Sequence, residues 1–299
     1  MENKFILTCE STVDLPYDYV CSRNIPVLFY TYTVNGVEYE DDMGKNPDSL
    51  KNFYALLDEG YLPSTSQINV FKYERFFESV IEKYDGEILH IAFGSGMTPS
   101  VNNAYDAAKK VMEKHPGRSI RVIDSLGSCS GYGLLVDDAA DLRDQGKTAK
   151  EVEDWALSVR NTIHHQFFAT DLKLFRRGGR VSGPAAAVAT VLNICPIMHL
   201  NSEGRIIAYG KVRGKKNSII KTVDEVEKNI RNGRDYDGKM FVAHSNCIDL
   251  AGETINELEK RFPKVKGKIR LENIGTTIAT HTGVGTVAVF FYGGERGIN

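Results

Sequence analysis

The chain carries two short apolar runs, Glu87-Ile88-Leu89-His90-Ile91-Ala92-Phe93 and Ser119-Ile120-Arg121-Val122-Ile123-Asp124, from which its fold can be predicted. Each run has the length and the branched apolar side chains of a buried strand. A helical pattern lies between them, with Thr98 as its cap and Pro99 in its first turn. The order strand, helix, strand is typical of parallel strands joined by a crossover helix.

The rest of the first half continues this alternation. Residues 4–9 and 25–29 are further strand candidates, and Asn35-Gly36 is a strong hairpin signal between two more. Helical patterns follow, one opened by Pro47 and one capped by Asn69. We therefore predict an α/β fold in which residues 1–161 form an N-terminal domain, a mainly parallel sheet with helices on both faces.

The second half mixes strand candidates with helices. The strand candidates are residues 166–170, 194–200, 205–209, 239–244, 268–274 and 286–292. A turn signal at residues 201–204 joins two of them as a hairpin, so part of this sheet should be antiparallel. We predict a second α/β domain over residues 162–299, with a mixed sheet.

Composition excludes several classes of protein. The chain has 299 residues, 42% of them hydrophobic and 25% charged, which is ordinary for a soluble globular protein. A net charge of -2 argues against nucleic-acid binding. The five cysteines are scattered without a C-x-x-C pair, which favours reduced thiols over disulfides or a zinc site. No signal peptide or membrane span is recognisable, so we expect a cytoplasmic protein without stable membrane insertion.

Hydroxyl-rich segments follow three strands of the predicted parallel sheet. They are residues 10–12, 94–98 and 125–128. Ligands bind beyond the carboxyl ends of such strands, so Ser11, Ser95 and Ser125 are expected at one edge. The alternative is that these hydroxyls cap the helices that follow. Ser95 is the better ligand candidate, because glycines flank it and a separate cap follows it.

Two further polar stretches are candidate binding segments. Pro63-Ser64-Thr65-Ser66-Gln67 holds three adjacent hydroxyls that helix capping does not use up. The tract from Gly275 to Gly285 sets His281 among threonines and glycines. We expect this tract to lie outside the core, because so many small polar groups would lack partners there. A small oxyanion held by His281 is one interpretation, and an ordinary loop with a solvent-facing histidine is the other.

Five segments, taken in order, resemble the motifs of the DegV family. They are Glu10-Ser11-Thr12-Val13-Asp14-Leu15-Pro16, Pro63-Ser64-Thr65-Ser66-Gln67, Arg177-Gly178-Gly179-Arg180-Val181, Val212-Arg213-Gly214-Lys215-Lys216 and Thr280-His281-Thr282-Gly283-Val284-Gly285. The resemblance implies a two-domain α/β protein that binds one long-chain fatty acid, with the ligand and its carboxyl group at the interface between the domains, and that needs no cofactor. It also implies a partner, the ATP-binding subunit of a bacterial fatty acid kinase, which converts the bound acid to an acyl phosphate.

Family roles can be carried over to individual positions of this chain. The resemblance implies that Thr65, Ser95 and His281 bind the ligand carboxylate, with Ser64 as a neighbour and Arg180 near the head group. The chain departs from the family pattern at several positions, which are Glu10, Gly94, Thr98, Pro99 and Cys195. These departures concern head-group geometry and chain selectivity more than the class of ligand.

The resemblance also requires room for the acyl chain and a face for the kinase. Small residues in the helical pattern of residues 184–192 could leave room for a tunnel, although close helix packing explains them equally well. Basic residues could form the docking face, or simply a solvated surface. They are Arg176, Arg177, Arg180, Arg213, Lys215 and Lys216.

An enzyme is the main alternative. Gly127-Ser128-Cys129-Ser130-Gly131 has the form of a G-x-nucleophile-x-G elbow between a strand and a helix. With His281 it suggests a cysteine hydrolase. A self-contained kinase is less favoured, because the chain has no G-x-x-x-x-G-K-[ST] phosphate loop.

Overall fold

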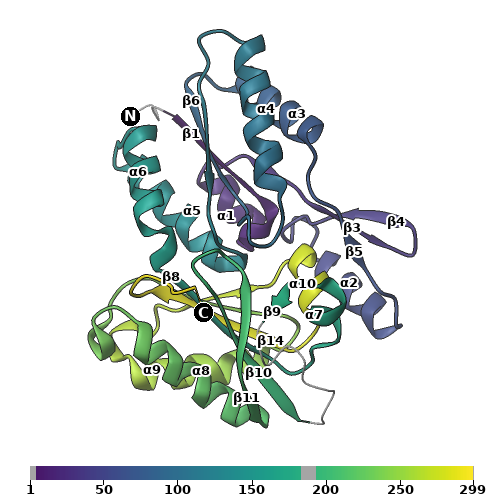
Figure 1. Ribbon diagram of the computed structural model, residues 1–299, viewed down its shortest axis with the longest axis vertical. Coiled ribbons are helices and arrows are strands. Elements are labelled where there is room, and N and C mark those ends of the chain that lie inside the picture. Colours follow the sequence, from purple (N-terminus) through teal and green to yellow (C-terminus); the bar gives the residue numbers. More distant parts are fainter. Residues whose placement is uncertain (1–4, 183–192, 299) are drawn as a thin grey trace.

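The computed structural model describes residues 5–182 and 193–298, and in this part of the chain the strands form three sheets. Figure 1 shows a parallel sheet above, a larger mixed sheet below and helices between and outside them. The helical pattern predicted for residues 184–192 lies outside the described residues. The fold is α/β, as predicted.

The parallel sheet has the strand order β2-β1-β6-β7, and each neighbouring pair is parallel. Its strands are β1 (Phe5–Glu10), β2 (Val27–Leu28), β6 (Glu87–Ala92) and β7 (Ile120–Asp124). Helices α3 (Val70–Lys83) and α4 (Ser100–Lys114) pack together on one side of it, and α5 (Cys129–Asp144) and α6 (Ala149–Val159) on the other (Figure 1). The prediction of helices on both faces is therefore confirmed.

Local signals place most of these helices where the sequence predicts them. The side chain of Asn69 accepts the Lys72 N–H and so caps α3. The N-cap of α4, however, is Pro99 and not the predicted Thr98. The Thr98 hydroxyl instead accepts the N–H of Ser100, the first residue of the helix, at 3.3 Å. Two shorter helices, α1 (Tyr17–Ser22) and α2 (Ser49–Asp58), complete the first half.

A small antiparallel sheet projects from the first half (Figure 1). Strands β3 (Thr31–Val34) and β4 (Val37–Glu40) form the predicted hairpin. Asn35 (φ 50°) and Gly36 (φ 78°) both adopt positive φ at its turn, as a tight two-residue hairpin requires. A third strand, β5 (Ser64–Thr65), pairs with β3. Residues 63–67 were predicted as a polar loop, and this pairing places two of them in a sheet.

The larger sheet has the order β13-β12-β14-β8-β10-β11-β9 and mixes parallel with antiparallel pairs, as predicted. Its strands are β8 (Ile163–Ala169), β9 (Val181–Ser182), β10 (Ile194–Leu200), β11 (Ile206–Arg213), β12 (Met240–His244), β13 (Arg270–Asn273) and β14 (Thr286–Tyr292). The predicted turn at residues 201–204 joins β10 and β11. Helices α8 (Lys215–Asn229) and α9 (Ile248–Arg261) cover its outer face, and α7 (Lys173–Gly178) and α10 (Thr276–Thr282) lie at its edge (Figure 1).

Helix α5 lies between the two sheets. It contacts β1 of the parallel sheet and β8, β12 and β14 of the mixed sheet. Twelve of its sixteen residues are buried, so it has no broad solvent-facing side. Gly131 allows the close approach, because a Cβ there would lie 2.6 Å from the Phe290 ring. The helix therefore packs against both halves of the molecule.

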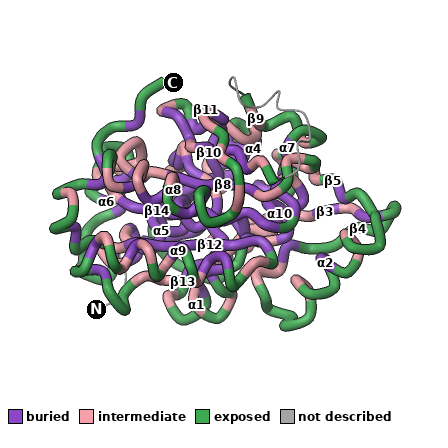
Figure 2. Tube along the Cα trace, turned by 90° about the horizontal axis from the view of Figure 1, so that it is seen from below, coloured by how far each residue is buried: buried purple, intermediate pink, exposed green. Residues whose placement is uncertain are grey.

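The apolar core follows the same arrangement. Its largest cluster includes Phe5 of the first half together with Phe167 and Phe290 of the second. Figure 2 shows buried residues concentrated along the central strands and α5, whereas β4 and much of α2 are exposed. The domain boundary after residue 161 stays a prediction. Among the described residues, no helix is long and apolar enough to cross a membrane.

Candidate functional site

The tract around His281 is a buried helix, so the prediction that it lies outside the core was wrong. Residues 276–282 form α10, and six of its seven residues are buried. Thr280 Oγ1 donates to the Thr276 carbonyl at 2.9 Å. The Asp41 carboxylate accepts both the N–H and the hydroxyl of Thr276, at 3.1 and 2.8 Å. Partners from the helix itself and from Asp41 thus satisfy the buried hydroxyls of Thr276 and Thr280, whereas the buried Thr277 hydroxyl has no hydrogen-bond partner.

His281 lies near the carboxyl end of α10 and faces the small sheet. Its Nε2 lies 2.7 Å from Oγ1 of Thr65 in β5. On its other side, a Cβ at Gly178 would lie 2.6 Å from the ring Nδ1, so only glycine leaves room for the imidazole. Arg177 donates to the Pro63 carbonyl at 2.6 Å and so links α7 to the segment that enters β5. Three chain segments therefore hold the histidine.

The charge state of His281 follows from its surroundings. Burial lowers its pKa to about 4, and the positive charges of Arg180 and Arg177 act in the same direction. The imidazole is therefore neutral near pH 7 and can both donate and accept a hydrogen bond. The two guanidinium groups provide a positive potential beside it, which would favour an anionic ligand.

A cavity of about 300 Å³ opens beside the Thr65–His281 pair. Its polar lining includes Ser66, Gln67 and Arg180, and its apolar lining includes Phe93 and Phe175. The other residues that line it are Tyr30, Met97, Thr98, Pro99, Ser128, Ile206, Thr277, Ile278 and Thr282. Its volume is at the lower end of the range of ~300–1,000 Å³ that is typical of small-molecule sites.

A second, more apolar space of about 50 Å³ adjoins the first. The two share five lining residues, which are Ser128, Phe175, Ile206, Ile278 and Thr282. Its remaining lining is Cys129, His165, Phe167, Leu200, Ile274, Thr286, Ala288 and Phe290. A polar entrance at His281 thus leads toward an apolar interior between α5 and the mixed sheet.

The structure brings only some of the predicted site residues together. Thr65, Arg180 and His281 line one cavity. Ser64 is exposed on β5 and lies outside that lining. Ser95 is also exposed and outside it, and its backbone N–H donates to the Asp124 carboxylate at 3.0 Å.

The loop that carries Ser95 contributes to the cavity through other residues. Met97, Thr98 and Pro99 line it. Gly94 explains one departure from the family pattern, because a Cβ there would lie 2.6 Å from the Gly127 carbonyl oxygen. Gly96 packs equally closely on the β10–β11 turn. The glycines thus allow close packing of this loop.

The other two candidate serines have internal roles. The Ser11 hydroxyl donates to Asp41 at 3.1 Å and accepts the Tyr30 N–H at 3.1 Å. The Ser125 hydroxyl accepts the Gly127 N–H at 3.1 Å. Both side chains are buried, and neither lines the cavity at His281. Their hydroxyls therefore form hydrogen bonds that stabilise the fold.

Several lining residues have no recognisable signal in the sequence. Tyr30, Phe175 and Ile278 are apolar or aromatic and cannot be told from core residues by pattern. Thr277 and Ser128 also line the cavity, but their segments are noticeable in the sequence only because of other residues, His281 and Cys129. Only the contact between α10 and β5 reveals which of these residues face the cavity.

The geometry does not support the cysteine hydrolase. Cys129 is 5% exposed, and burial, with the charge of Asp14, raises the pKa of its thiol well above the usual value. Its Sγ contacts Ser130 Oγ at 3.9 Å, whereas His281 contacts Thr65. The thiol therefore lacks both the low pKa and the histidine partner of a nucleophile.

One group of carboxylates has metal-ligand spacing within the described residues: Asp137, Asp138 and Asp141. Lys239 already occupies it, with its Nζ 2.6 Å from Asp138 and 2.6 Å from Asp141. This group is therefore an ion-pair network that joins α5 to the segment before β12.

Known proteins are similar to this chain over nearly its whole length. A family model described as an uncharacterised protein of the DegV family matches residues 4–293. A DegV domain-containing protein of Clostridium perfringens is 36% identical over 293 residues, which cover 98% of this chain and 99% of that protein.

Solved structures show the same fold. A DegV lipid-binding protein from Thermotoga maritima matches with a TM-score of 0.85 at 24% identity, over 98% of this chain and 99% of that one. The fatty acid kinase (Fak) B3 protein of Streptococcus pneumoniae, loaded with linoleic acid, matches with a TM-score of 0.81 at 20% identity, over 97% and 99%. From the family model and the Clostridium relative together, we conclude that the chain belongs to the DegV family.

Proposed function

We propose that this protein is a cytoplasmic carrier that binds one long-chain fatty acid and presents its carboxylate to an ATP-dependent kinase subunit. The observation that carries the proposal is the cavity whose polar entrance, Thr65 and His281, leads toward the apolar lining of Phe167 and Phe290. This order of polar and apolar groups matches the two ends of a fatty acid. The proposed role requires no cofactor.

The acyl chain supplies most of the expected affinity. A sixteen-carbon acid buries about fourteen methylenes at ~0.8 kcal/mol each, or up to about 11 kcal/mol before the costs of binding. A single head-group hydrogen bond contributes only ~0.5–1.5 kcal/mol net. The tail therefore determines affinity, and the head group determines where the carboxylate lies.

Uncharged donors suit a carboxylate that must remain reactive. The Thr65 hydroxyl and neutral His281 form one hydrogen-bonded pair, which can donate to a single carboxylate oxygen, whereas a bidentate arginine would occupy both oxygens. Arg180 lies at the same cavity and adds positive potential. In the proposed kinase reaction a carboxylate oxygen attacks the γ-phosphorus of ATP, ADP leaves, and an acyl phosphate forms.

Two exposed basic segments are the candidate docking face for the kinase subunit. Arg176, Arg177 and Arg180 follow β8, and Arg213, Lys215 and Lys216 surround the start of α8. Within the described residues none of the six side chains forms an ion pair. Arg177 donates to the Pro63 carbonyl and Arg180 lines the cavity, which leaves the other four for a partner. The solved relative that is named a fatty acid kinase B3 protein supports a partner of this class.

Mass spectrometry of the purified protein tests the lipid part of the proposal. We expect the native protein to carry the mass of one fatty acid per chain and to release it into organic solvent. The released acid identifies the preferred length and saturation. A protein that is empty after purification and stays empty with long-chain acids would contradict the proposal.

Charge reversal tests the kinase part separately. An Arg213→Glu, Lys216→Glu variant should retain its bound fatty acid but support less ATP-dependent acyl phosphate formation with the kinase subunit, measured by trapping the product with hydroxylamine. A matched Lys266→Glu, Lys268→Glu variant alters the exposed segment just before β13 and should behave like the unmodified protein. Equal loss of lipid and of coupling would refute the docking role.

A further inference from the structure

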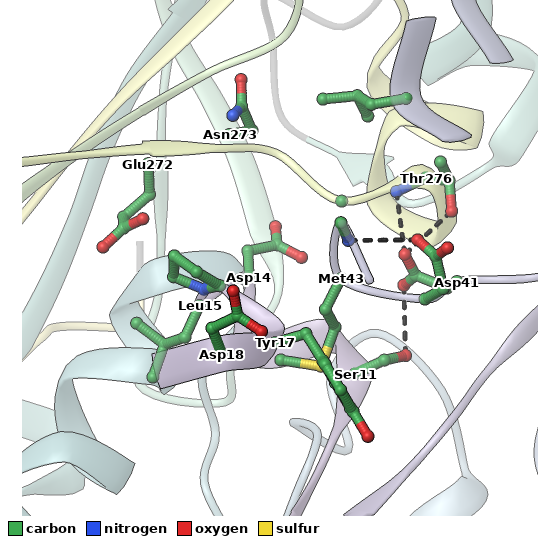
Figure 3. Close-up of a pocket in the computed structure, with 15 residues that line it drawn as sticks. Ser11, Asp14, Leu15, Tyr17, Asp18, Asp41, Met43, Glu272, Asn273 and Thr276 are labelled. Atoms are coloured by element: carbon green, nitrogen blue, oxygen red, sulfur yellow. Dashed lines mark hydrogen bonds between the residues drawn. The ribbon is translucent and has the colours of Figure 1, made fainter. Parts of the chain in front are cut away.

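A second pocket, of about 210 Å³, lies on another part of the molecule. It is formed by the loop at residues 11–18, the loop at residues 41–44 and residues 272–276, which lead into α10 (Figure 3). It shares no lining residue with the cavity at His281. Any role of this pocket is therefore independent of the proposed fatty-acid site.

The pocket is strongly acidic. Its lining contains five carboxylates, Asp14, Asp18, Asp41, Asp42 and Glu272, and no lysine, arginine or histidine among the described residues. Three of the five have ordinary structural partners, and one of these is Asp41, which accepts hydrogen bonds from Ser11 and Thr276. Glu272 pairs with Arg270 at 2.7 Å, and Asp42 accepts backbone N–H groups of its own loop.

Asp14 is the exception in this group. It is 4% exposed, and neither of its carboxylate oxygens has a hydrogen-bond partner. The Gly275 amide and the Cys129 thiol lie near it, but neither makes a hydrogen bond of ordinary geometry with it. Its backbone is left-handed (φ 47°), and Figure 3 shows its carboxyl group directed toward Asp41. A buried carboxylate without donors is costly unless something compensates its charge.

The carboxyl groups of Asp14 and Asp41 face the same point beside Gly275. A Cβ at Gly275 would lie 2.5 Å from Asp14 Oδ1 and 3.2 Å from Asp41 Oδ1. Asp41 is 1% exposed. A positive charge at this point would compensate the negative charge of the two buried carboxylates.

We propose that this pocket binds a hydrated hard divalent cation, Mg²⁺ or Ca²⁺, with Asp14 as a direct ligand and Asp41 beside it. Among the described residues no third carboxylate has chelating spacing here, so a closed cage of protein ligands is excluded. Mg²⁺ characteristically binds one or two carboxylates and keeps several waters, for which this pocket has room.

The position of the site indicates what the cation would do. Asp14 and Asp41 belong to the first half of the chain, whereas Gly275 and Thr276 begin the helix that carries His281. A bound cation would therefore compensate buried negative charge at the place where these two chain segments meet. Binding to the folded state alone raises its stability by mass action.

Terbium luminescence provides a direct test, because Tyr17 lines the pocket and can sensitise a bound Tb³⁺ ion. We expect Tb³⁺ to bind to the full-length protein and to be displaced by Ca²⁺ or Mg²⁺. D14N should weaken Tb³⁺ binding by about tenfold or more. The matched control D141N removes a carboxylate from the other acidic group and should bind Tb³⁺ like the unmodified protein.

Two measurements do not depend on the folding of a variant. The melting temperature of the unmodified protein should rise with millimolar Mg²⁺ or Ca²⁺ relative to choline chloride of equal ionic strength. In crystals soaked with Mn²⁺, an anomalous peak should lie within bonding distance of Asp14. An unchanged melting temperature, a peak elsewhere, or Tb³⁺ binding that is equal in D14N would overturn the proposal.

Discussion

His281 acts as a hydrogen-bonding group and not as a charge. Its neutral state results from burial and from the two neighbouring arginines, which also favour an anion nearby. A protonated histidine would bind a carboxylate more tightly but would withdraw charge from its oxygens and so weaken it as a nucleophile. At the scale of one residue, the proposed function assigns attraction of the anion to Arg177 and Arg180, and its placement to the Thr65–His281 pair.

Removal of the imidazole should separate binding from reaction. We expect His281→Ala to retain most bound fatty acid, because the tail determines affinity, and to lose acyl phosphate formation with the kinase subunit. Extraction with mass spectrometry measures the first, and hydroxylamine trapping measures the second. Ser64→Ala, one residue from Thr65 and exposed, should change neither. A His281→Ala protein that binds no lipid would disprove this division.

The lowered pKa of His281 also predicts a pH dependence of stability. The unfolded histidine has a pKa near 6.5, so between about pH 6.5 and about pH 4 the unfolded state binds more protons than the folded state. Stability should therefore fall as the pH falls through this window. His281→Gln should reduce the drop in melting temperature between neutral and mildly acidic buffer. The other buried histidines remain in both proteins, so an identical drop would refute the assignment.

At the scale of the helix or strand, sequence signals gave correct predictions where the interacting residues are close together in the sequence. Asn69 caps α3, and Asn35-Gly36 makes the hairpin, because both effects involve neighbouring residues. Helix α10 was not predicted, because its burial depends on Asp41, far away in the sequence. Strand β5 was missed for a related reason, since only pairing with β3 makes its two residues a strand.

The packing of α5 on the mixed sheet gives a prediction for this element. A Cβ at Gly131 would lie 2.3 Å from His165 Nε2 and 2.6 Å from the Phe290 ring, so Gly131→Ala should destabilise the protein by about 1–3 kcal/mol. Gly252→Ala in α9 is the matched control, because its Cβ meets nothing within 4 Å. Gly252→Ala should stabilise by up to about 1 kcal/mol. Urea unfolding measures both, and equal effects would contradict this account.

At the scale of the whole molecule, the two halves share one apolar cluster. Phe5 and Phe290 belong to it although they come from opposite ends of the chain. The parallel strands, the mixed sheet and the order of the elements follow from apolar patterning, and they were predicted. The cavity was not, because its wall combines α10, β5 and the loop after β6, and patterning does not fix how such segments meet.

The shared cluster predicts a single cooperative unfolding transition. If neither half can bury its apolar residues alone, the calorimetric and van't Hoff enthalpies should agree, and melting curves from different probes should coincide. Trp155 in α6 reports on the first half, and far-ultraviolet circular dichroism reports on the whole. Two separate transitions would show that the halves fold independently, as the predicted domain division alone would suggest.

The burial of α5 on nearly every side also bears on how this sequence can change over generations. A replacement there must fit the parallel sheet and the mixed sheet at once, so few of the possible replacements are neutral. In α9 only four of fourteen residues are buried, so most of its positions are less tightly constrained by packing. Amino-acid substitutions among descendants of this protein should therefore accumulate in the outer helices. The sequence of α5 should change slowly, whichever ligand the cavity binds.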